Sequence, residues 1–233
     1  NGSTRVKMPL REHIRVTATK RSVVCDVISE QYLEVGMSLN GRLEKLRDLE
    51  SSTVTTGHQL QICGGPAFFH YKIITTIRLA RKLEKESGRG VVPIFWLASE
   101  DHDFKEVSWV NGESDKFVWS NHLENSKLPV GKFSLEGLEE VVRGWGANGV
   151  DFIESEAVML ELQKAKANGE KYVHLFRRWL ELWYGDTELL VLDASHPKLK
   201  NSAATLFAHE FRGSGIAKAV LETTEELKLR GFK

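Results

Sequence analysis

An acidic pentapeptide is the first chemical feature of this sequence. Residues 99–103 read S-E-D-H-D, so Glu100, Asp101, His102 and Asp103 place three carboxylates and an imidazole at consecutive positions. Such groups can bind a substrate amine, act as a general base or hold a divalent metal. Neighbouring side chains of an extended segment point to opposite sides, so at most two or three of the four can face one ligand. We predict catalytic roles for them, with a solvated acidic turn as the alternative. No metal site is predicted, because no second histidine or cysteine group has zinc-like spacing.

A glycine-rich segment forms the second group. Residues 57–59 read G-H-Q and residues 64–66 read G-G-P. Glycines let the backbone approach a ligand closely, and the first N–H groups of a helix favour anions. His58 adds a titratable ring and joins the catalytic candidates. The predicted anion- and substrate-binding residues here are Gly57, Gln59, Gly64, Gly65 and Lys72. The spacing matches neither G-x-G-x-x-G nor a P-loop, so an ordinary strand-to-helix turn stays the alternative.

Both groups need a parallel sheet to bring them together. The β-branched run 53–56 predicts a strand, and the apolar run 91–98 predicts a second strand buried on both faces. The apolar spacing of residues 69–83 predicts a helix between them. Strand, helix and strand make a βαβ unit, whose parallel strands end at one edge of the sheet. A third strand at 189–193 is expected to end at the same edge. The substrate-binding candidates that follow from this placement are Ser99 and Asp193.

The remaining patterns divide the chain into four parts. A helical pattern over 22–49 breaks at Gly36, a hairpin turns at Asn111-Gly112, and an aromatic-striped helix covers 170–184. Three strands are few for so many helices, so the chain is expected to be the front part of a longer protein. The predicted parts are an N-terminal arm with helices packing on the core (1–50), the first part of the core (51–103), an insertion (104–170), and a return to the core that starts further helices (171–233).

Composition excludes several classes of partner. Thirty-two basic residues balance thirty-two acidic ones, which gives no electrostatic argument for nucleic acid or an anionic membrane. No apolar run is long enough to span a bilayer. Two cysteines, Cys25 and Cys63, do not make a disulfide framework and favour a reducing, cytoplasmic setting. We expect both to be buried, inert thiols.

Three motifs in order resemble one known family. They are T-T-G-H-Q with G-G-P-A-F-F-H-Y-K, then V-V-P-I-F-W-L-A-S-E-D-H-D-F-K-E-V, and then Y-G-D-T-E-L-L-V-L-D-A-S-H-P. Together they resemble the bacillithiol biosynthesis cysteine-adding enzyme (BshC) family from about residue 50 onward. The resemblance implies an α/β fold with a Rossmann-like parallel core, similar to class I nucleotidyltransferases, and an α+β connecting-peptide insertion. It also implies a homodimer formed through a C-terminal coiled coil that this chain lacks.

The same resemblance implies an activity, which is to join the carboxyl group of L-cysteine to the amine of glucosaminyl-malate. In this ligase hypothesis the N–H groups beyond Gly64 and Gly65, with Lys72, hold an anionic moiety. One of the acids at 100–103 binds or deprotonates the amine, and His58 or His102 moves protons. The alternatives are a non-catalytic nucleotide- or small-molecule-binding module, or a nucleotidyltransferase-like enzyme with another acceptor.

Two departures from the family pattern bear on the site. The chain has Gly57-His58-Gln59 where the family usually has G-Q-Q, which adds a titratable ring. The H-I-G-H signature of the wider superfamily is replaced by Ala67-Phe68-Phe69-His70. The cofactor therefore stays open, with ATP or another nucleotide as the option that the resemblance implies.

Overall fold

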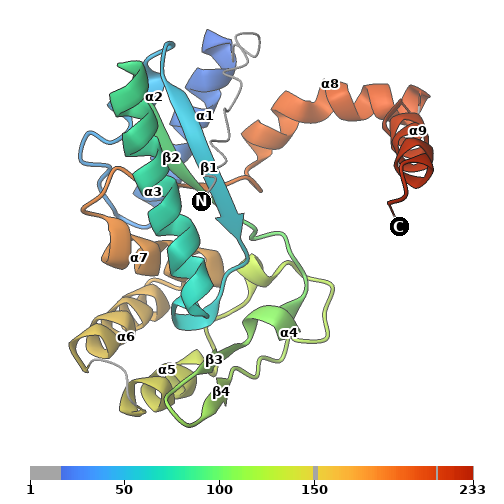
Figure 1. Ribbon diagram of the computed structural model, residues 1–233. Coiled ribbons are helices and arrows are strands. Elements are labelled where there is room, and N and C mark those ends of the chain that lie inside the picture. The colour runs from blue at the N-terminus through green and yellow to red at the C-terminus, as the bar shows by residue number, and fades with distance from the viewer. Residues whose placement is uncertain (1–16, 149–151, 214, 233) are drawn as a thin grey trace, which may run out of the picture.

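A three-stranded parallel sheet lies at the centre of the computed structural model, which describes residues 17–148, 152–213 and 215–232 (Figure 1). Its strands are β1 (Ser52–His58), β2 (Val91–Leu97) and β5 (Leu190–Asp193), in the order β1-β2-β5. The three predicted strands and their parallel pairing are confirmed. Of the predicted N-terminal arm, the segment 1–16 lies outside the described residues.

The middle strand is buried except at one position. Trp96 is 47% exposed, whereas every other residue of β2 is buried. In the register of the sheet Trp96 lies opposite Gly57, and a Cβ on Gly57 would come within 3.2 Å of the Trp96 Cβ. Gly57 has no side chain to cover the indole. The prediction that this strand is buried on both faces is therefore wrong at Trp96.

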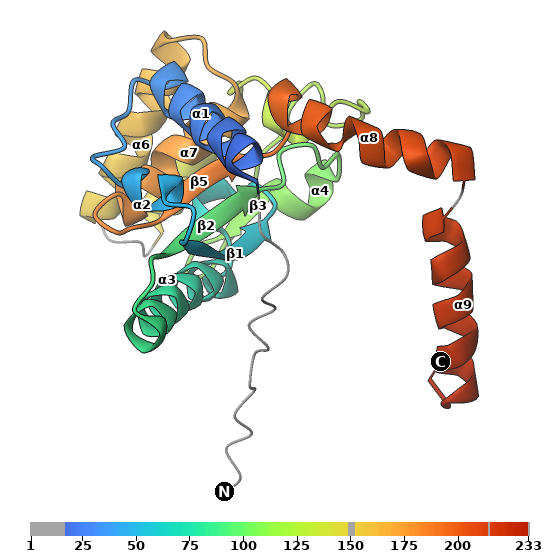
Figure 2. The same ribbon diagram turned by 90° about the horizontal axis from the view of Figure 1, so that it is seen from above.

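Helices cover both faces of the sheet, as Figure 2 shows from above. On one side α3 (Ala67–Ser87) follows Pro66 and ends at Gly88, which adopts the left-handed conformation. Its buried face includes Phe69, Ile73, Ile77 and Ala80, the spacing predicted for one helix face. On the other side lie α1 (Ala18–Glu34) and α7 (Tyr172–Tyr184). The helical pattern resumes after Gly36 only as the short α2 (Glu44–Arg47).

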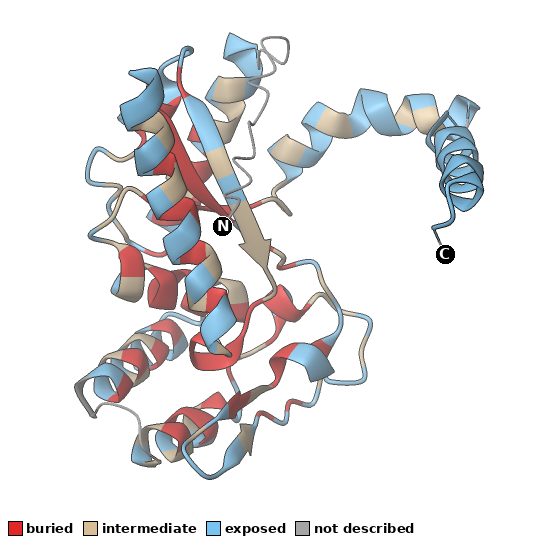
Figure 3. Ribbon diagram, in the orientation of Figure 1, coloured by how far each residue is buried: buried red, intermediate tan, exposed pale blue. Residues whose placement is uncertain are grey.

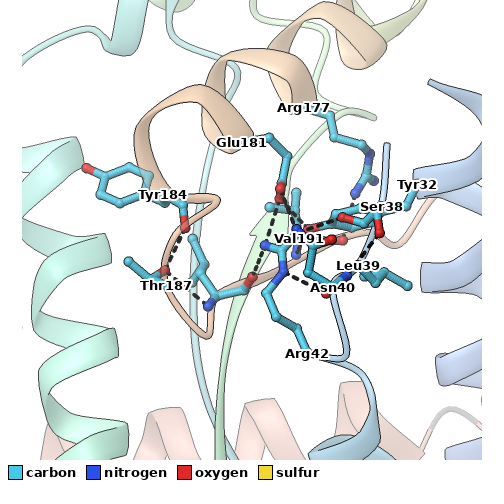
Figure 4. Close-up of polar contacts among 11 residues, drawn as sticks. Tyr32, Ser38, Leu39, Asn40, Arg42, Arg177, Glu181, Tyr184, Thr187 and Val191 are labelled. Atoms are coloured by element: carbon cyan, nitrogen blue, oxygen red, sulfur yellow. Dashed lines mark hydrogen bonds and ion pairs between the residues drawn. The ribbon is translucent and has the colours of Figure 1, made fainter. Parts of the chain in front are cut away.

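The outer edge of β5 is closed by side chains instead of a strand (Figure 4). Tyr32 accepts a hydrogen bond from the Val191 N–H group at 3.2 Å, and Arg177 donates to the Val191 carbonyl at 2.8 Å. Arg42 donates to the Leu189 carbonyl at 3.0 Å. Arg42 also forms a two-bond ion pair with Glu181, whose shorter contact is 2.6 Å. Backbone groups that would otherwise be unpaired at this edge are thus satisfied by α1, α7 and the loop before α2.

The insertion packs against the end of the sheet. It contains α4 (Phe104–Val107), the antiparallel pair β3 (Trp109–Asn111) and β4 (Lys116–Val118), α5 (Leu138–Ala147) and α6 (Phe152–Ala167). Two short 3-10 turns, η1 (Ile62–Gly64) and η2 (Val130–Lys132), lie in the connections. One cluster of buried apolar residues runs through both sheet and insertion. The division between core and insertion at residue 104 therefore stays a prediction.

The last two helices extend away from the rest of the molecule. These are α8 (Pro197–Gly213) and α9 (Gly215–Leu229), which lie in the part of the chain predicted to start further helices. None of the residues described in them is buried, and Figure 3 shows them mostly exposed. In the part of the chain that the structure describes, no helix is long and apolar enough to cross a membrane.

Candidate functional site

The carboxyl ends of the three strands meet at one edge of the sheet. His58 lies level with Leu97, and Leu97 lies level with Asp193. The Ala98 N–H group donates to the His58 carbonyl at 3.1 Å, which continues the pairing just beyond the strands. The predicted convergence of these three segments is therefore confirmed at the level of the backbone.

An open cleft of about 680 Å³ lies at this edge, between the segment after β1 and the start of the insertion. Three predicted site residues line it, namely His58, Gln59 and Asp103. The other lining residues are Gln61, Pro66, Phe68, Lys105, Glu106 and Trp109.

Gln59 holds two carboxylates with one amide group. Its Nε2 donates to Asp101 Oδ2 and to Glu106 Oε2, each at 2.7 Å. The Asp103 backbone N–H group donates to Asp101 Oδ1 at 3.0 Å. The pKa of Asp101 is lowered by this backbone bond first and also by the Gln59 bond, because both stabilise the ionised form. The cleft is thus bordered by acidic groups in a fixed arrangement.

His58 is positioned to accept a proton. Its ring lies against Phe68 and Phe69, with centroid distances of 5.2 and 5.8 Å. Burial lowers its pKa, and the nearby Lys72 charge lowers it further, while the Gln59 carbonyl and Glu106 act in the opposite direction. The Nδ1 atom lies 3.2 Å from the Gln59 carbonyl oxygen. A carbonyl only accepts hydrogen bonds, so Nδ1 carries the hydrogen and Nε2 is the basic atom of the neutral ring.

The predicted anion-binding groups are engaged within the loop. Lys72 donates through Nζ to the Gly57 carbonyl at 2.6 Å. The N–H groups of Gly64 and Gly65 donate to the carbonyls of Gln61 and Ile62, at 3.3 and 2.8 Å. All of these contacts hold the turn between β1 and α3 together, and the glycines and Lys72 do not line the cleft.

Two of the predicted catalytic residues lie apart from the cleft. Glu100 forms an ion pair with Lys200 of α8, and both side chains are about half exposed. His102 is exposed and does not line the cleft. The expectation that only some of residues 100–103 face one ligand agrees with this placement.

Ser99 and Asp193 form a buried link between β2 and β5. Ser99 Oγ donates to Asp193 Oδ1 at 2.6 Å, and the Ser195 N–H group donates to the same oxygen at 2.9 Å. Gln31 binds both backbone groups of Asp193, accepting from its N–H at 3.0 Å and donating to its carbonyl at 2.7 Å. The structure brings Ser99 and Asp193 together as predicted. Their side chains bond to each other, and neither residue lines the cleft.

Sequence reasoning missed six lining residues. Pro66 was considered only as part of G-G-P, Phe68 only as part of the segment that replaces the H-I-G-H signature, and Trp109 lies just before the predicted hairpin turn. Lys105 and Glu106 follow the acidic pentapeptide after one intervening residue, Phe104, so their proximity in sequence was an available signal. Gln61 gave no signal, because a lone glutamine between two apolar residues has no motif. Within the described residues, no group of three or more His, Cys, Asp or Glu side chains is placed to hold a metal ion.

Comparison with known proteins identifies relatives over most of the chain. The profile of one family, described as bacillithiol biosynthesis BshC, N-terminal Rossmann-like domain, matches residues 4–233. A protein of Christiangramia forsetii is 32% identical over 218 residues, which cover 92% of this chain and 40% of the relative. One of Flavobacterium johnsoniae is 30% identical over 211 residues, covering 89% and 39%. Both are named "Putative cysteine ligase BshC". The chain thus spans about 40% of the length of these relatives.

Proposed function

The chain belongs to the BshC N-terminal Rossmann-like domain family, and on that premise we propose that it contributes the amine-binding cleft of a cysteine ligase. The reaction joins the carboxyl group of L-cysteine to the amine of glucosaminyl-malate. Amide formation requires the amine to lose its charge before it attacks, so the site needs groups that bind an ammonium and then remove a proton.

The observation that carries this proposal is the acidic, histidine-containing cleft. Glu106 and Asp103 line it, and Asp101 is held beside it by Gln59. Carboxylates at such positions attract a substrate ammonium group. His58, with its lowered pKa and basic Nε2, accepts the proton that the amine releases. In this proposal the acids bind the amine and His58 is the base.

An anionic part of the substrate requires a cation on the same cleft. Lys105 is the one lysine or arginine among the lining residues. Lys72, which the sequence favoured for this role, donates to the Gly57 carbonyl instead. We therefore assign the malate or cysteine carboxylate to Lys105, as a point charge that draws the anionic end of the ligand to one side of the cleft.

Calorimetry with this chain tests the binding half of the proposal. Glucosaminyl-malate should bind, and Glu106→Gln should weaken that binding about tenfold, because the amide keeps the hydrogen bond to Gln59 but loses the charge. Malate, which lacks the amino sugar, should bind both variants alike. The matched control is Glu113→Gln, an exposed glutamate outside the cleft. Equal binding of glucosaminyl-malate to all three proteins would rule out an amine subsite at Glu106.

Mass spectrometry of a full-length relative tests the reaction half. Incubation with L-cysteine, glucosaminyl-malate and ATP should yield the amide, and omission of ATP decides whether a nucleotide activates the cysteine carboxyl group. Binding without any amide product would favour the second candidate, a non-catalytic binding module. The Lys72 and glycine contacts favour that candidate over a nucleotidyltransferase, since the loop groups suited to phosphate are already bonded.

The proposal extends to the setting of the whole protein. Both cysteines are free and buried, which agrees with a reducing, cytoplasmic compartment. The homodimer implied by the family resemblance is retained as part of the proposal, with light scattering of a full-length relative as its test.

A further inference from the structure

Gln61 carries a buried oxygen that has no partner. It follows β1 by three residues, lines the cleft and is 5% exposed. Its Oε1 atom is buried and makes no hydrogen bond with any described residue. Buried side-chain oxygens are nearly always hydrogen-bonded, so an exception at the wall of a cleft needs a physical reason.

The loop is shaped to hold this side chain in place. The Gln61 N–H group donates to the Gln59 carbonyl at 3.0 Å, and the Gln61 carbonyl accepts from Gly64. A Cβ added to Gly65 would lie 2.6 Å from Gln61 Cβ and 3.1 Å from Oε1. Only a glycine at position 65 leaves room for the Gln61 side chain. The second glycine of G-G-P thus makes room for the Gln61 side chain.

Gln31 shows what a structural glutamine looks like in the same protein. It is also 5% exposed, but both ends of its amide are used. Nε2 donates to the Asp193 carbonyl, and Oε1 accepts from Arg177 and from the Asp193 N–H group. Two equally buried glutamines therefore differ in one respect, namely whether the carbonyl oxygen is satisfied by the fold.

We propose that Gln61 is a ligand-binding residue: when a molecule binds in the cleft, a small shift of the Gln61 side chain opens Oε1, which is buried in the ligand-free fold, to accept a hydrogen bond from an N–H or O–H donor of that molecule. The surroundings favour such a donor. Asp103 and Glu106 on the same cleft also accept from donors, and Phe68 and Trp109 offer ring faces suited to the C–H groups of a sugar. The chemical class is a hydroxyl-rich amine, and its identification with glucosaminyl-malate rests on the proposed function.

A measurement without ligand tests the central claim. In Gln61→Met the unpaired oxygen is replaced by an apolar group of similar size, so the melting temperature should stay equal or rise. In the matched variant Gln31→Met three satisfied hydrogen bonds are lost, and the melting temperature should fall. A fall in Gln61→Met comparable to that in Gln31→Met would show that the fold or a resident water already satisfies Oε1, and would overturn the proposal.

A measurement with ligand tests the identity of the donor. Affinity for glucosaminyl-malate should fall about tenfold in Gln61→Met, and Gln61→Glu, which keeps an acceptor oxygen, should bind at least as tightly as the wild type. Affinity for malate should be the same in all three. Undiminished binding of glucosaminyl-malate by Gln61→Met would overturn the proposal. If the wild type does not bind this ligand, the ligase assignment fails, whereas the melting comparison still decides whether Gln61 is held for a ligand.

Discussion

Gln59 and Gln61 lie two residues apart after the same strand, yet their amides are used in opposite ways. Gln59 gives its N–H groups to Asp101 and Glu106, and these bonds fix the acidic side of the cleft. Gln61 keeps a buried oxygen unpaired. Position in the sequence marked Gln59, because it adjoins Gly57-His58. Nothing in the sequence marked Gln61, because its importance depends on the missing Cβ of Gly65 and on burial, which only the folded loop shows.

Replacing Gln59 with methionine should raise the pKa of Asp101, because one hydrogen bond to the carboxylate is lost while the Asp103 backbone bond remains. In the folded wild type this pKa lies below its ordinary value of 3.8, so the stabilisation is present above that value and is lost as the pH falls through the folded pKa. The stability difference between wild type and Gln59→Met should therefore shrink below about pH 4. Carboxyl-carbon NMR titration measures the pKa directly.

The control for this experiment is Gln163→Met, an exposed glutamine on α6. It should leave the Asp101 titration where it is in the wild type. An unchanged Asp101 pKa in Gln59→Met would mean that the amide does not stabilise this carboxylate in solution.

Replacing Gly65 with alanine should lower the free energy of unfolding by more than about 2 kcal/mol. Backbone strain at such a residue alone costs about this much, and the clash of the new Cβ adds to it. Gly65 has φ +57° and ψ −148°, a region populated almost only by glycine, and the new Cβ would meet Gln61. Gly88→Ala is the matched control, because Gly88 also has a positive φ but has no atom near the site of a Cβ. Urea unfolding that gives equal losses for the two variants would contradict a clash with Gln61.

At the scale of elements, the spacing of apolar residues predicted the strands of the sheet and the helix between the first two. It did not predict the side chains that bond to the outer edge of the sheet. The β-branched and apolar runs were enough to predict β1, β2, β5 and α3. They could not show that Tyr32, Arg42 and Arg177 close the outer edge of β5. The contact of Arg42 with Leu189 joins residues 147 positions apart, and that of Tyr32 with Val191 joins residues 159 positions apart, so no local pattern encodes them.

Replacing Arg42 with methionine should destabilise the protein by about 3 kcal/mol, since breaking a buried ion pair leaves an uncompensated charge. The side chains of Arg42 and Glu181 are 8% and 11% exposed. Arg81→Met is the matched control, because Arg81 also forms an ion pair with a glutamate, Glu188, but both partners are about half exposed. That variant should cost less than about 1 kcal/mol. Equal losses in a urea titration would show that burial does not distinguish the two pairs.

At the scale of the whole molecule, the described residues fall into a packed body and an exposed helical extension. The body shares one apolar core, whereas α8 and α9 bury no side chain. The sequence predicted further helices in this part of the chain, and Pro197 at the start of α8 is a local signal for one of them. Apolar residues recur along both helices, such as Phe207 and Val220, but these are more than half exposed. Periodicity shows which face is apolar and not what covers it.

Amide hydrogen exchange should separate these two parts in this chain. Amides of α9 and of α8 beyond its first turn should exchange much faster than those of α7, because helical segments without buried residues open locally at low free-energy cost, whereas Leu199 in the first turn of α8 packs on the core. Mass spectrometry of peptic fragments measures the difference. Protection in α9 equal to that in α7 would show that this extension is covered in solution, for example by a second copy.

The side chains that bond to the outer edge of β5 also determine at which edge of the sheet another strand can pair. An incoming strand cannot pair beside β5, where Tyr32 and Arg177 already occupy the main-chain groups of Val191. The opposite margin is available, because β2 is the only strand that pairs with β1 in the described part of the chain. A parallel newcomer there would end level with His58, next to the cleft. A strand added there would therefore border the cleft on the side of His58.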